Sequence, residues 1–538
     1  MKLSREGIKN AEAWQKAGIS VPGFDVEAMI KKTVDKPEWV HFGAGNIFRG
    51  FMAACHQELL EAGGAETGII AVETFDEEII DDIYGRYDNL TLNVLAGADG
   101  SLAMKVIASV AEAIAGNPSR TEEWNRLVWI FRQPSLKLVT FTITEKGYGI
   151  YDSTGHFLKI IDSDIEKGLE NPAHAMSRLT ALMYERYLAG GYPVALVSTD
   201  NCARNGEKLC SAVLTIAEAW YEKAFVDEGF ILYLKDGKSV SFPWSMIDKI
   251  TPRPSEEIRK AIEARGVEGM DRIVTGKNTY IAPFVNAEVS QYLFIEDDFP
   301  NGRFPLEKAT GIWLTDRETV NKIERMKVTA CLNPLHTAIA IAGWLLGHTM
   351  VVEAMKDREV SRLVERIGYV EGLPVVVNPG VISPREFLGE VFHNRFRNPY
   401  IPDTTMRIAT DTSQKVGIRF GETIKSYAEN EKLDTQNLIG ISLTIAAWCR
   451  YLLAVDDAGK PMNLSPDPML EDLKACLSGI RLGDPGSMGG SLKPILSNKN
   501  IFGSDLYEAG LGEKIEGYFR EMIAGNGAVR RTLEKYLR

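Results

Sequence analysis

The sequence predicts an α/β protein, in which a domain with a mostly parallel sheet is followed by a predominantly α-helical domain. Its 538 residues are too many for one compact core, so two large domains are expected. Across residues 39–313, short runs of β-branched and aromatic residues alternate with amphipathic helical stretches, as in parallel α/β sheets. After about Thr315 the pattern becomes helical, and the Pro- and Gly-bearing segment 296–311 precedes the change. We therefore predict domains at residues 1–312 and 313–538.

Three runs are the clearest predicted strands of the first domain. They are residues 38–42, 138–143 and 194–197, and each ends abruptly in small or polar residues. In open parallel sheets, ligands bind outside the carboxyl ends of the strands, so the residues after these runs should line one crevice. In the second domain, the longest predicted helices span residues 319–328, 333–354 and 435–455.

Charge and residue types exclude several classes of partner. The net charge of -12 and the pI near 5.4 argue against nucleic acid or an anionic membrane as the main partner, but allow an acidic substrate in a locally basic pocket. The first 18 residues have no apolar core, so no secretion signal is expected. The longest apolar runs, near 338–346 and 438–447, are too short or too interrupted to cross a bilayer.

The cysteines and histidines indicate a cytoplasmic protein without a zinc site. The six cysteines form no C-x-x-C pair, and the seven histidines form no H-E-x-x-H motif. We expect reduced, mostly structural thiols and no bound metal. Nothing in the sequence indicates the oligomeric state.

The first predicted strand leads into a glycine-bearing turn. In WVHFGAGNIFRGF, residues 39–51, a strand precedes Gly43-x-Gly45 and then a helix. Such glycines let the backbone approach a pyrophosphate, which rests on the N–H groups of the helix N-terminus. Phe48 replaces the third glycine of the usual fingerprint, so an ordinary βα turn stays an alternative. The candidate cofactor ligands here are Gly43, Gly45, Asn46, Ile47, Phe48 and Arg49.

The second strand of this unit, GIIAVE at residues 68–73, ends in a carboxylate. Glu73 lies 28 residues after Gly45, where a ribose-binding acid belongs if the cofactor is NAD. A carboxylate there would repel the 2′-phosphate of NADP. The alternative is that Glu73 belongs to a surface cluster with Asp76, Glu77 and Glu78.

Polar residues follow the other strands. TITEKGY at 142–148 adds Thr144 and Glu145 as cofactor candidates, and STDNCARNG at 198–206 adds Asn201, which could also be turn chemistry. Asp248 lies in a Pro-flanked loop.

Residues 395–420 are unusually basic. The segment carries Arg395, Arg397, Arg407, Lys415 and Arg419. In an acidic chain, this cluster suggests an anionic or polyhydroxylated substrate, although a solvated face is possible.

The stretch KVTACLNPLHTAIAIAGWLLGH, residues 327–348, places three polar residues before an apolar helix. Asn333 before Pro334 is the expected N-cap and N1 pair. His336 could be a core histidine and Lys327 a solvated charge.

Together these segments resemble the polyol-specific long-chain dehydrogenase/reductase family, whose best-known members are mannitol dehydrogenase-like. Six segments carry the resemblance in order, and it covers the chain roughly from Trp39 to Phe420. The segments are HFGAGNIFRGF, TITEKGY, STDNCARNG, FPWSMIDKITP, KVTACLNPLHTA and RFRNPYIPDTTMRIATDTSQK. The resemblance implies metal-independent hydride transfer between NAD and a secondary alcohol of a small polyol or sugar acid.

The resemblance also assigns roles. Lys327 is implied as the acid in ketone reduction and the base in alcohol oxidation, with Asn201 and Asn333 donating to the reacting oxygen. It implies that His336 holds a neighbouring hydroxyl, and that Arg407 and Lys415, eight apart, bind distal hydroxyls or a carboxylate. Asp248 is carried over as a substrate ligand.

Within the family, chain length and the CLNPLHTA segment favour interconversion of D-fructuronate and D-mannonate. Tagaturonate with altronate, and fructose with mannitol, stay open as substrates. A non-catalytic dinucleotide-binding regulatory protein is the alternative of another class.

One departure from the family pattern yields a structural prediction. The lysine precedes the asparagine by six residues here, against five in better-known members. On a regular helix the extra residue would rotate Lys327 by about 100° away from the site. Because Pro334 disfavours helical geometry at Asn333, we predict a break or π-bulge between Lys327 and Asn333 that absorbs the insertion.

Overall fold

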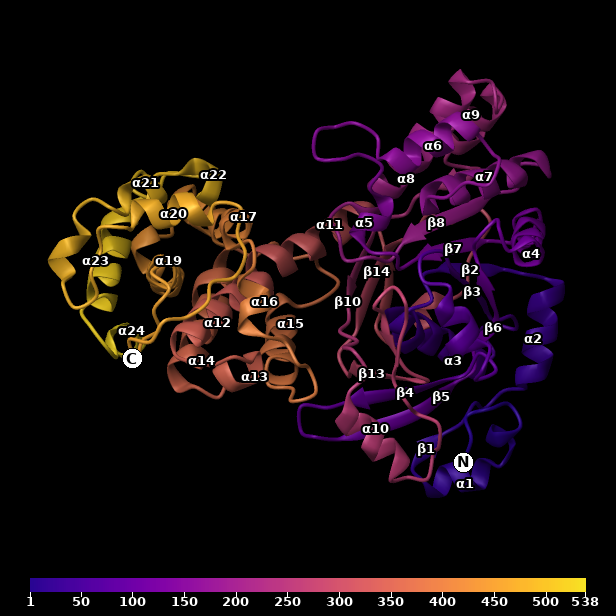
Figure 1. The fold of residues 1–538 in the computed structure, drawn as a ribbon, viewed down its shortest axis with the longest axis horizontal. Helices are drawn as coiled ribbons and strands as arrows, with labels where there is room; N and C mark the ends of the chain where they lie inside the picture. The colour runs from indigo at the N-terminus through magenta and orange to yellow at the C-terminus, as the bar shows by residue number, and fades with distance from the viewer. The chain divides into compact units, whose positions relative to one another are not determined.

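The computed structural model describes all 538 residues, and the chain divides into two compact units. Unit 1 comprises residues 1–97 and 101–321, and unit 2 comprises residues 322–538 with 98–100. The division falls within helix α11 (Arg317–Met326), a few residues beyond the boundary expected at 312. Every named strand precedes it, whereas unit 2 is built from helices (Figure 1).

A six-stranded parallel sheet forms the centre of unit 1. Its order is β6 (Val110–Ala115), β3 (Ile69–Glu73), β2 (Trp39–Phe42), β7 (Leu138–Phe141), β8 (Val194–Ser198) and β9 (Val240–Ser241). In Figure 1 the labels β6, β3, β2, β7 and β8 follow one another in this order. This is the dinucleotide-binding order, in which the chain reverses its direction across the sheet between β2 and β7. The predicted Rossmann-type fold is confirmed.

The sheet is buried on both faces, and its strands are predominantly apolar. Alternate residues of β2 face opposite sides: Val40 and Phe42 join one core cluster, and Trp39 joins the other. The first cluster includes residues of α4 (Thr121–Phe131), α7 (Ala175–Leu188) and α8 (Asn205–Glu222). The second includes residues of α3 (Ala53–Glu61). Continuous apolar strands with helices on both sides are what parallel sheets require.

Not all of unit 1 follows the predicted parallel pattern. Strands β4 (Thr91–Ala96) and β5 (Leu102–Ile107) form an antiparallel hairpin between β3 and β6 in the chain. The five-residue loop that joins them is too short for a parallel crossover. The remaining strands are β1 (Ile19–Ser20), β10 (Ser245–Asp248), β11 (Ile273–Val274), β12 (Tyr280–Ile281), β13 (Phe284–Glu288), β14 (Tyr292–Glu296) and β15 (Ile312–Thr315).

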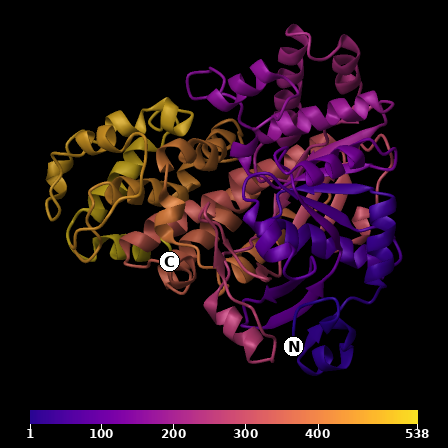
Figure 2. The same ribbon diagram turned by 45° about the vertical axis from the view of Figure 1, so that its right-hand side comes forward.

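The other helices of unit 1 lie around these sheets, and Figures 1 and 2 both show the N-terminus, coloured indigo, at one end of the unit. They are α1 (Ala11–Lys16), α2 (Val26–Asp35), α5 (Glu145–Tyr148), α6 (Lys159–Lys167), α9 (Glu228–Lys235) and α10 (Glu256–Glu263).

Two buried helices, α12 (Asn333–Leu345) and α19 (Ile439–Tyr451), form the core of unit 2 and pack against each other. Both are apolar on nearly every side, as expected of helices enclosed by others. The surrounding helices are α13 (Val351–Ala354), α14 (Arg358–Glu365), α15 (Pro384–Glu390), α16 (Thr405–Ala409), α17 (Thr412–Val416), α18 (Glu422–Ala428), α20 (Leu470–Cys476), α21 (Lys493–Leu496), α22 (Lys499–Phe502), α23 (Gly512–Met522) and α24 (Ala528–Tyr536).

The helix predicted at 333–354 is divided in the structure. Helix α12 ends at Leu345, and Gly347 follows with φ +87°, a left-handed conformation suited to glycine. The N–H of His348 donates to the carbonyl of Gly343, at 2.8 Å, which closes the helix end. The prediction of one long helix was wrong because this glycine terminator was overlooked.

One helical stretch, residues 317–345, has the length and composition to cross a membrane. In the structure, 72% of its most apolar window is buried within the protein. A π turn and an irregular residue, Leu332, interrupt it. It packs here as a core helix.

Six π turns occur along the chain, although such turns are rare in proteins. They are η2 (Phe48–Met52), η3 (Ile80–Tyr84), η5 (Lys327–Cys331), η6 (Arg366–Gly372), η8 (Val391–Arg395) and η9 (Gly417–Gly421). Since π turns frequently mark functional sites, it is notable that η2 carries Phe48, η5 carries Lys327, and η8 and η9 carry two arginines of the basic segment.

Candidate active site

The fold requires a glycine at only one of the two glycine positions in the turn after β2. Gly43 has φ +103°, and a Cβ atom there would lie 2.2 Å from the carbonyl oxygen of Thr142. The fold itself therefore excludes any other residue at this position. At Gly45 the φ angle is ordinary, and an added Cβ would meet no atom within 4 Å. The fold therefore does not require a glycine at Gly45, and the open space beside it leaves room for the predicted approach of a ligand to the backbone.

The helix that follows offers its N-terminus to an anion. Gly45, Asn46 and Ile47 are partly exposed at its start, where backbone N–H groups have no intrahelical acceptor. This arrangement fits a dinucleotide pyrophosphate. Phe48, in place of the third fingerprint glycine, is buried and stacks on His41 with ring centroids 4.1 Å apart. A π turn accommodates this ring where the usual fold needs a glycine for close packing.

Arg49 lies beneath the turn. Its side chain is fully buried, and its guanidinium donates to Asn46 Oδ1 at 2.7 Å and to the carbonyl of Ala282 at 2.8 Å. Predicted as a cofactor ligand, Arg49 is placed by the structure as a residue that positions Asn46.

The carboxylate of Glu73 stabilises the glycine turn through hydrogen bonds. Its oxygens accept the N–H groups of Ala44 at 2.9 Å, of Thr74 at 3.0 Å and of Phe75 at 2.8 Å. Burial raises the pKa of Glu73, and these backbone N–H groups oppose that shift. Only 7% of the residue is exposed, so it does not belong to an acidic surface cluster. Its predicted contact with a ribose stays a prediction.

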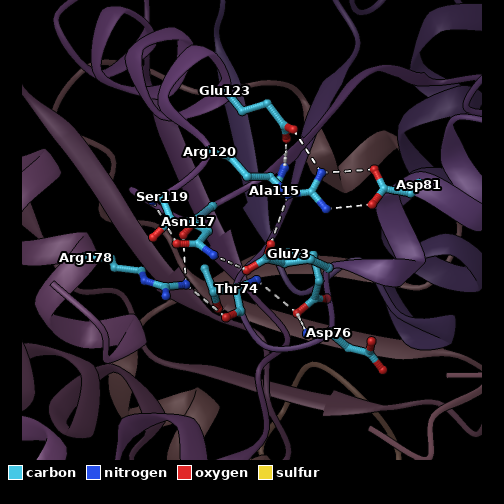
Figure 3. Close-up of polar contacts among 12 residues, drawn as sticks. Glu73, Thr74, Asp76, Asp81, Ala115, Asn117, Ser119, Arg120, Glu123 and Arg178 are labelled. Carbon is cyan, nitrogen blue, oxygen red and sulfur yellow. Dashed lines mark hydrogen bonds and ion pairs between the residues drawn. The ribbon is translucent and has the colours of Figure 1, made fainter. Parts of the chain in front are cut away.

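Two arginines near the end of β3 already have partners. Arg120 pairs with Asp81 at 2.6 Å, and with Glu77 and Glu123 at 3.1 Å (Figure 3). Arg178 is buried and donates to three backbone carbonyl groups. The charges of Arg120 and Arg178 are thus already compensated or enclosed and do not offer a site for a 2′-phosphate. The segment after β3 therefore favours a dinucleotide that lacks this phosphate.

The ends of β7 and β8 are joined by Asp200, a residue that sequence reasoning missed. Its carboxylate accepts the N–H groups of Ile143 and Thr144, both at 2.9 Å, and the hydroxyl of Tyr148 at 2.6 Å. Thr144 is held at φ +67°, ψ 160°, a conformation almost confined to glycine that costs about 1–3 kcal/mol. Backbone strain of this kind marks functional sites.

The other predicted site residues of unit 1 differ in their exposure and contacts. Asn201 is exposed directly after Asp200, and Glu145 pairs with Lys208. Asp248 does not lie in a loop as expected: it is the last residue of β10 and is buried with 6% exposure. The signal that could have found Asp200 is its place beside Asn201 in the STDN segment.

In unit 2, the predicted irregularity before Pro334 is confirmed. Lys327 opens a π turn, in which the N–H of Leu332 donates to the Lys327 carbonyl at 3.1 Å. Leu332 then leaves helical geometry, with φ -136° and ψ -63°, before α12 begins at Asn333. A π turn holds one residue more than an α turn, so it takes up the inserted residue.

The structure excludes two alternative interpretations, one for Asn333 and one for Lys327. Leu332, rather than Asn333, is the N-cap, and no side chain caps the helix, so the capping interpretation of Asn333 was wrong. Lys327 is 3% exposed and is therefore not a solvated surface charge. That its amine reaches the Asn333 and His336 side chains stays a prediction.

His336 is surrounded by charges of the basic segment. Its ring lies 4.9 Å from that of Phe396. Burial lowers the pKa of His336 to about 3; the carboxylate of Asp403 opposes this shift, and the positive charges of Arg395, Arg419 and Arg407 reinforce it. The imidazole is thus neutral at physiological pH and can both donate and accept a hydrogen bond.

The two predicted distal ligands are also in this unit. Arg407 is exposed and forms a bidentate pair with Asp403, with both N–O distances 2.7 Å. Lys415 donates to the carbonyl of Thr410 at 2.5 Å. Unit 2 thus brings together His336 and the charges of the basic segment.

A pH dependence of stability follows from His336. Its pKa rises from about 3 in the folded protein to about 6.5 when unfolded, so protons favour the unfolded state as the pH falls below 6.5. Between pH 7 and pH 5, His336→Gln should therefore lose roughly 1–2 kcal/mol less stability than the wild type. Urea unfolding at both pH values measures this difference. The same substitution at the exposed His393 is the control, and equal losses in both variants would contradict the assignment.

Relatives of this chain act on polyols and sugar acids. The D-mannonate oxidoreductase of Thermotoga maritima is 55% identical over 536 residues, which cover 99% of each chain. Among solved structures, a substrate-free D-sorbitol dehydrogenase matches with a TM-score of 0.78 and 24% identity, over 96% of this chain and 98% of its own. The Pseudomonas fluorescens mannitol 2-dehydrogenase complex with NAD and D-mannitol matches with a TM-score of 0.70 and 24% identity, over 100% and 99%. At this identity the structures show a shared fold.

Family models cover both units. Residues 37–308 match the mannitol dehydrogenase Rossmann domain, and residues 319–523 match the mannitol dehydrogenase C-terminal domain. The resemblance found in the sequence is thereby confirmed. With both domains matched and a full-length relative at 55% identity, the chain belongs to the mannitol dehydrogenase family of oxidoreductases.

Proposed function

We propose that this chain is an NAD-dependent oxidoreductase that interconverts D-fructuronate and D-mannonate without a metal ion. The observation that carries the proposal is the 55% identity, over 99% of both chains, to a D-mannonate oxidoreductase. The arginines around His336 support a substrate with a carboxylate. Five buried or partly buried cysteines, Cys55, Cys210, Cys331, Cys449 and Cys476, form no disulfide, which suits the reducing cytoplasm that we propose as its location.

The glycine turn and the end of β3 fit the proposed cofactor. The approachable backbone at Gly45 suits a pyrophosphate, and the carboxylate of Glu73 disfavours a 2′-phosphate. The bound nicotinamide would supply the hydride for ketone reduction and accept it in alcohol oxidation.

The chain's own residues would handle the proton and the oxygen. Lys327 gives a proton to the ketone oxygen during reduction and takes it back during oxidation, and its burial eases loss of the ammonium charge. The amide of Asn333 donates to that oxygen while negative charge develops there. Asn201, exposed after β8, is the second proposed amide donor. Neutral His336 holds a neighbouring hydroxyl, and Arg407 and Lys415 hold distal groups.

A panel of substrates and cofactors tests the proposal. We expect the highest kcat/KM with D-fructuronate and NADH, with lower values for tagaturonate and fructose. One missing polar contact changes kcat/KM by about 10-fold or more, so a panel can rank these substrates. A preference for tagaturonate or fructose would overturn the substrate. A preference for NADPH would overturn the cofactor, and Lys277, whose amine lies 5.3 Å from the ring of Phe75, would become the candidate phosphate ligand.

A further inference from the structure

We propose that Arg419 binds the carboxylate of the sugar acid and thereby makes this site prefer hexuronates over uncharged polyols. The inference rests on the proposed function, whose sequence-based ligands were Arg407 and Lys415. It assigns the main recognition of the carboxylate to a different residue of the same segment.

The fold holds Arg419 on a rigid turn beside the candidate catalytic residues. Its π turn, η9, packs against η5, which carries Lys327, and against α12, which carries His336. The glycine-bearing side of η9 packs closely against α22. A Cβ at Gly417 would lie 2.8 Å from the Ile501 carbonyl oxygen, and one at Gly421 would lie 2.0 Å from the Phe502 carbonyl oxygen.

The side chain of Arg419 extends towards α12. Its Nη1 donates to Thr337 Oγ1 at 2.7 Å, and Thr337 directly follows His336 in the chain. The Thr337 hydroxyl in turn donates to the carbonyl of Asn333 at 3.3 Å. These contacts anchor the guanidinium at the start of α12, the helix that also carries Asn333 and His336.

The charge of Arg419 is uncompensated. Its hydrogen-bonding partner is a neutral hydroxyl, it forms no ion pair, and burial alone lowers the pKa of its guanidinium to about 10. A partly buried cation without an acid is costly, and a carboxylate ligand would remove that cost. The fork of a guanidinium also matches the two oxygens of a carboxylate.

Neighbouring cations are less suited to this role. Arg407 is already paired with Asp403 through two bonds, and its side chain is 69% exposed. Lys415 donates to a backbone carbonyl, and the charges of Asp411 and Asp467 act on it. Arg397 is exposed and donates to Ser361. Of these four cations, Arg419 therefore has the charge most in need of an anion.

The test compares an acid and an uncharged ketose in the full-length enzyme. Arg419→Gln keeps a donor for Thr337 but removes the charge. We expect kcat/KM for D-fructuronate to fall by about 10²–10³-fold, the usual effect of truncating one partner of a desolvated charge pair. Activity with fructose should stay within about threefold, because fructose has no carboxylate to lose this contact. Arg419→Lys, which restores the charge but not the fork, should recover part of the loss.

The controls separate this inference from the proposed function and from misfolding. Arg397→Gln, at an exposed arginine of the same segment, should change neither substrate's kcat/KM. Thermal midpoint and NADH affinity of Arg419→Gln should match the wild type. Equal losses for fructuronate and fructose would overturn the inference, since they would indicate a structural role. A wild-type enzyme with no activity on fructuronate would overturn the proposed function. If the wild type instead reduces another hexuronate, and Arg419→Gln lowers kcat/KM for that acid but not for fructose, the carboxylate contact would still be supported.

Discussion

Replacing Lys327 by alanine should lower kcat for D-fructuronate reduction by about 10²–10⁴-fold, the range expected when a general acid is removed. The side chain is 3% exposed at the start of a π turn, so no surface lysine can replace it. The affinity for NADH should change by less than about threefold, because the glycine turn is in unit 1. Steady-state kinetics and a fluorescence titration with NADH measure the two quantities.

The matched control is Lys425→Ala, an exposed lysine of α18 in the same unit. It should keep wild-type kcat. Retention of more than a tenth of the activity in Lys327→Ala would place the proton donor elsewhere. A wild-type chain that binds NADH but turns over no substrate would favour the non-catalytic regulatory alternative.

Local signals in the sequence were sufficient for the sheet and for the irregular helix. The strands β2, β3, β7 and β8 were predictable because they are short runs of mainly apolar, β-branched and aromatic residues, the pattern expected of a sheet buried on both faces. The π turn at Lys327 was predictable because an odd spacing coincides with a proline. In both cases the residues that determine the local structure lie within or a few positions from the element that they form.

Other features depend on partners distant in the sequence. The antiparallel hairpin β4–β5 uses the same residue types as parallel strands, so composition could not distinguish it. Glu73 was recognised as important, but its bond to the Ala44 N–H spans 29 positions. Glu422, three residues after Arg419, pairs instead with Arg325 at 3.7 Å, so the lack of an acid at Arg419 also depends on tertiary packing.

The two glycines of the turn after β2 should respond to alanine in opposite ways. Gly43→Ala should lower the free energy of unfolding of unit 1 by about 2–6 kcal/mol, the sum of a positive-φ strain and an overpacking cost. Its Cβ would meet the Thr142 carbonyl at 2.2 Å, and the φ of +103° is unsuited to alanine. Soluble yield and the urea midpoint of unit 1 report this loss.

Gly45→Ala is the matched test of ligand approach. Its Cβ would meet nothing within 4 Å and its φ is ordinary, so stability should change by no more than about 1 kcal/mol. If a pyrophosphate rests on this backbone, the methyl group should nevertheless weaken NADH binding by about 10-fold or more, since the ligand must retreat from the N–H groups. An unchanged NADH affinity in a stable Gly45→Ala variant would move the cofactor away from the turn. A loss of both stability and affinity would mean that this glycine serves the fold, as Gly43 does.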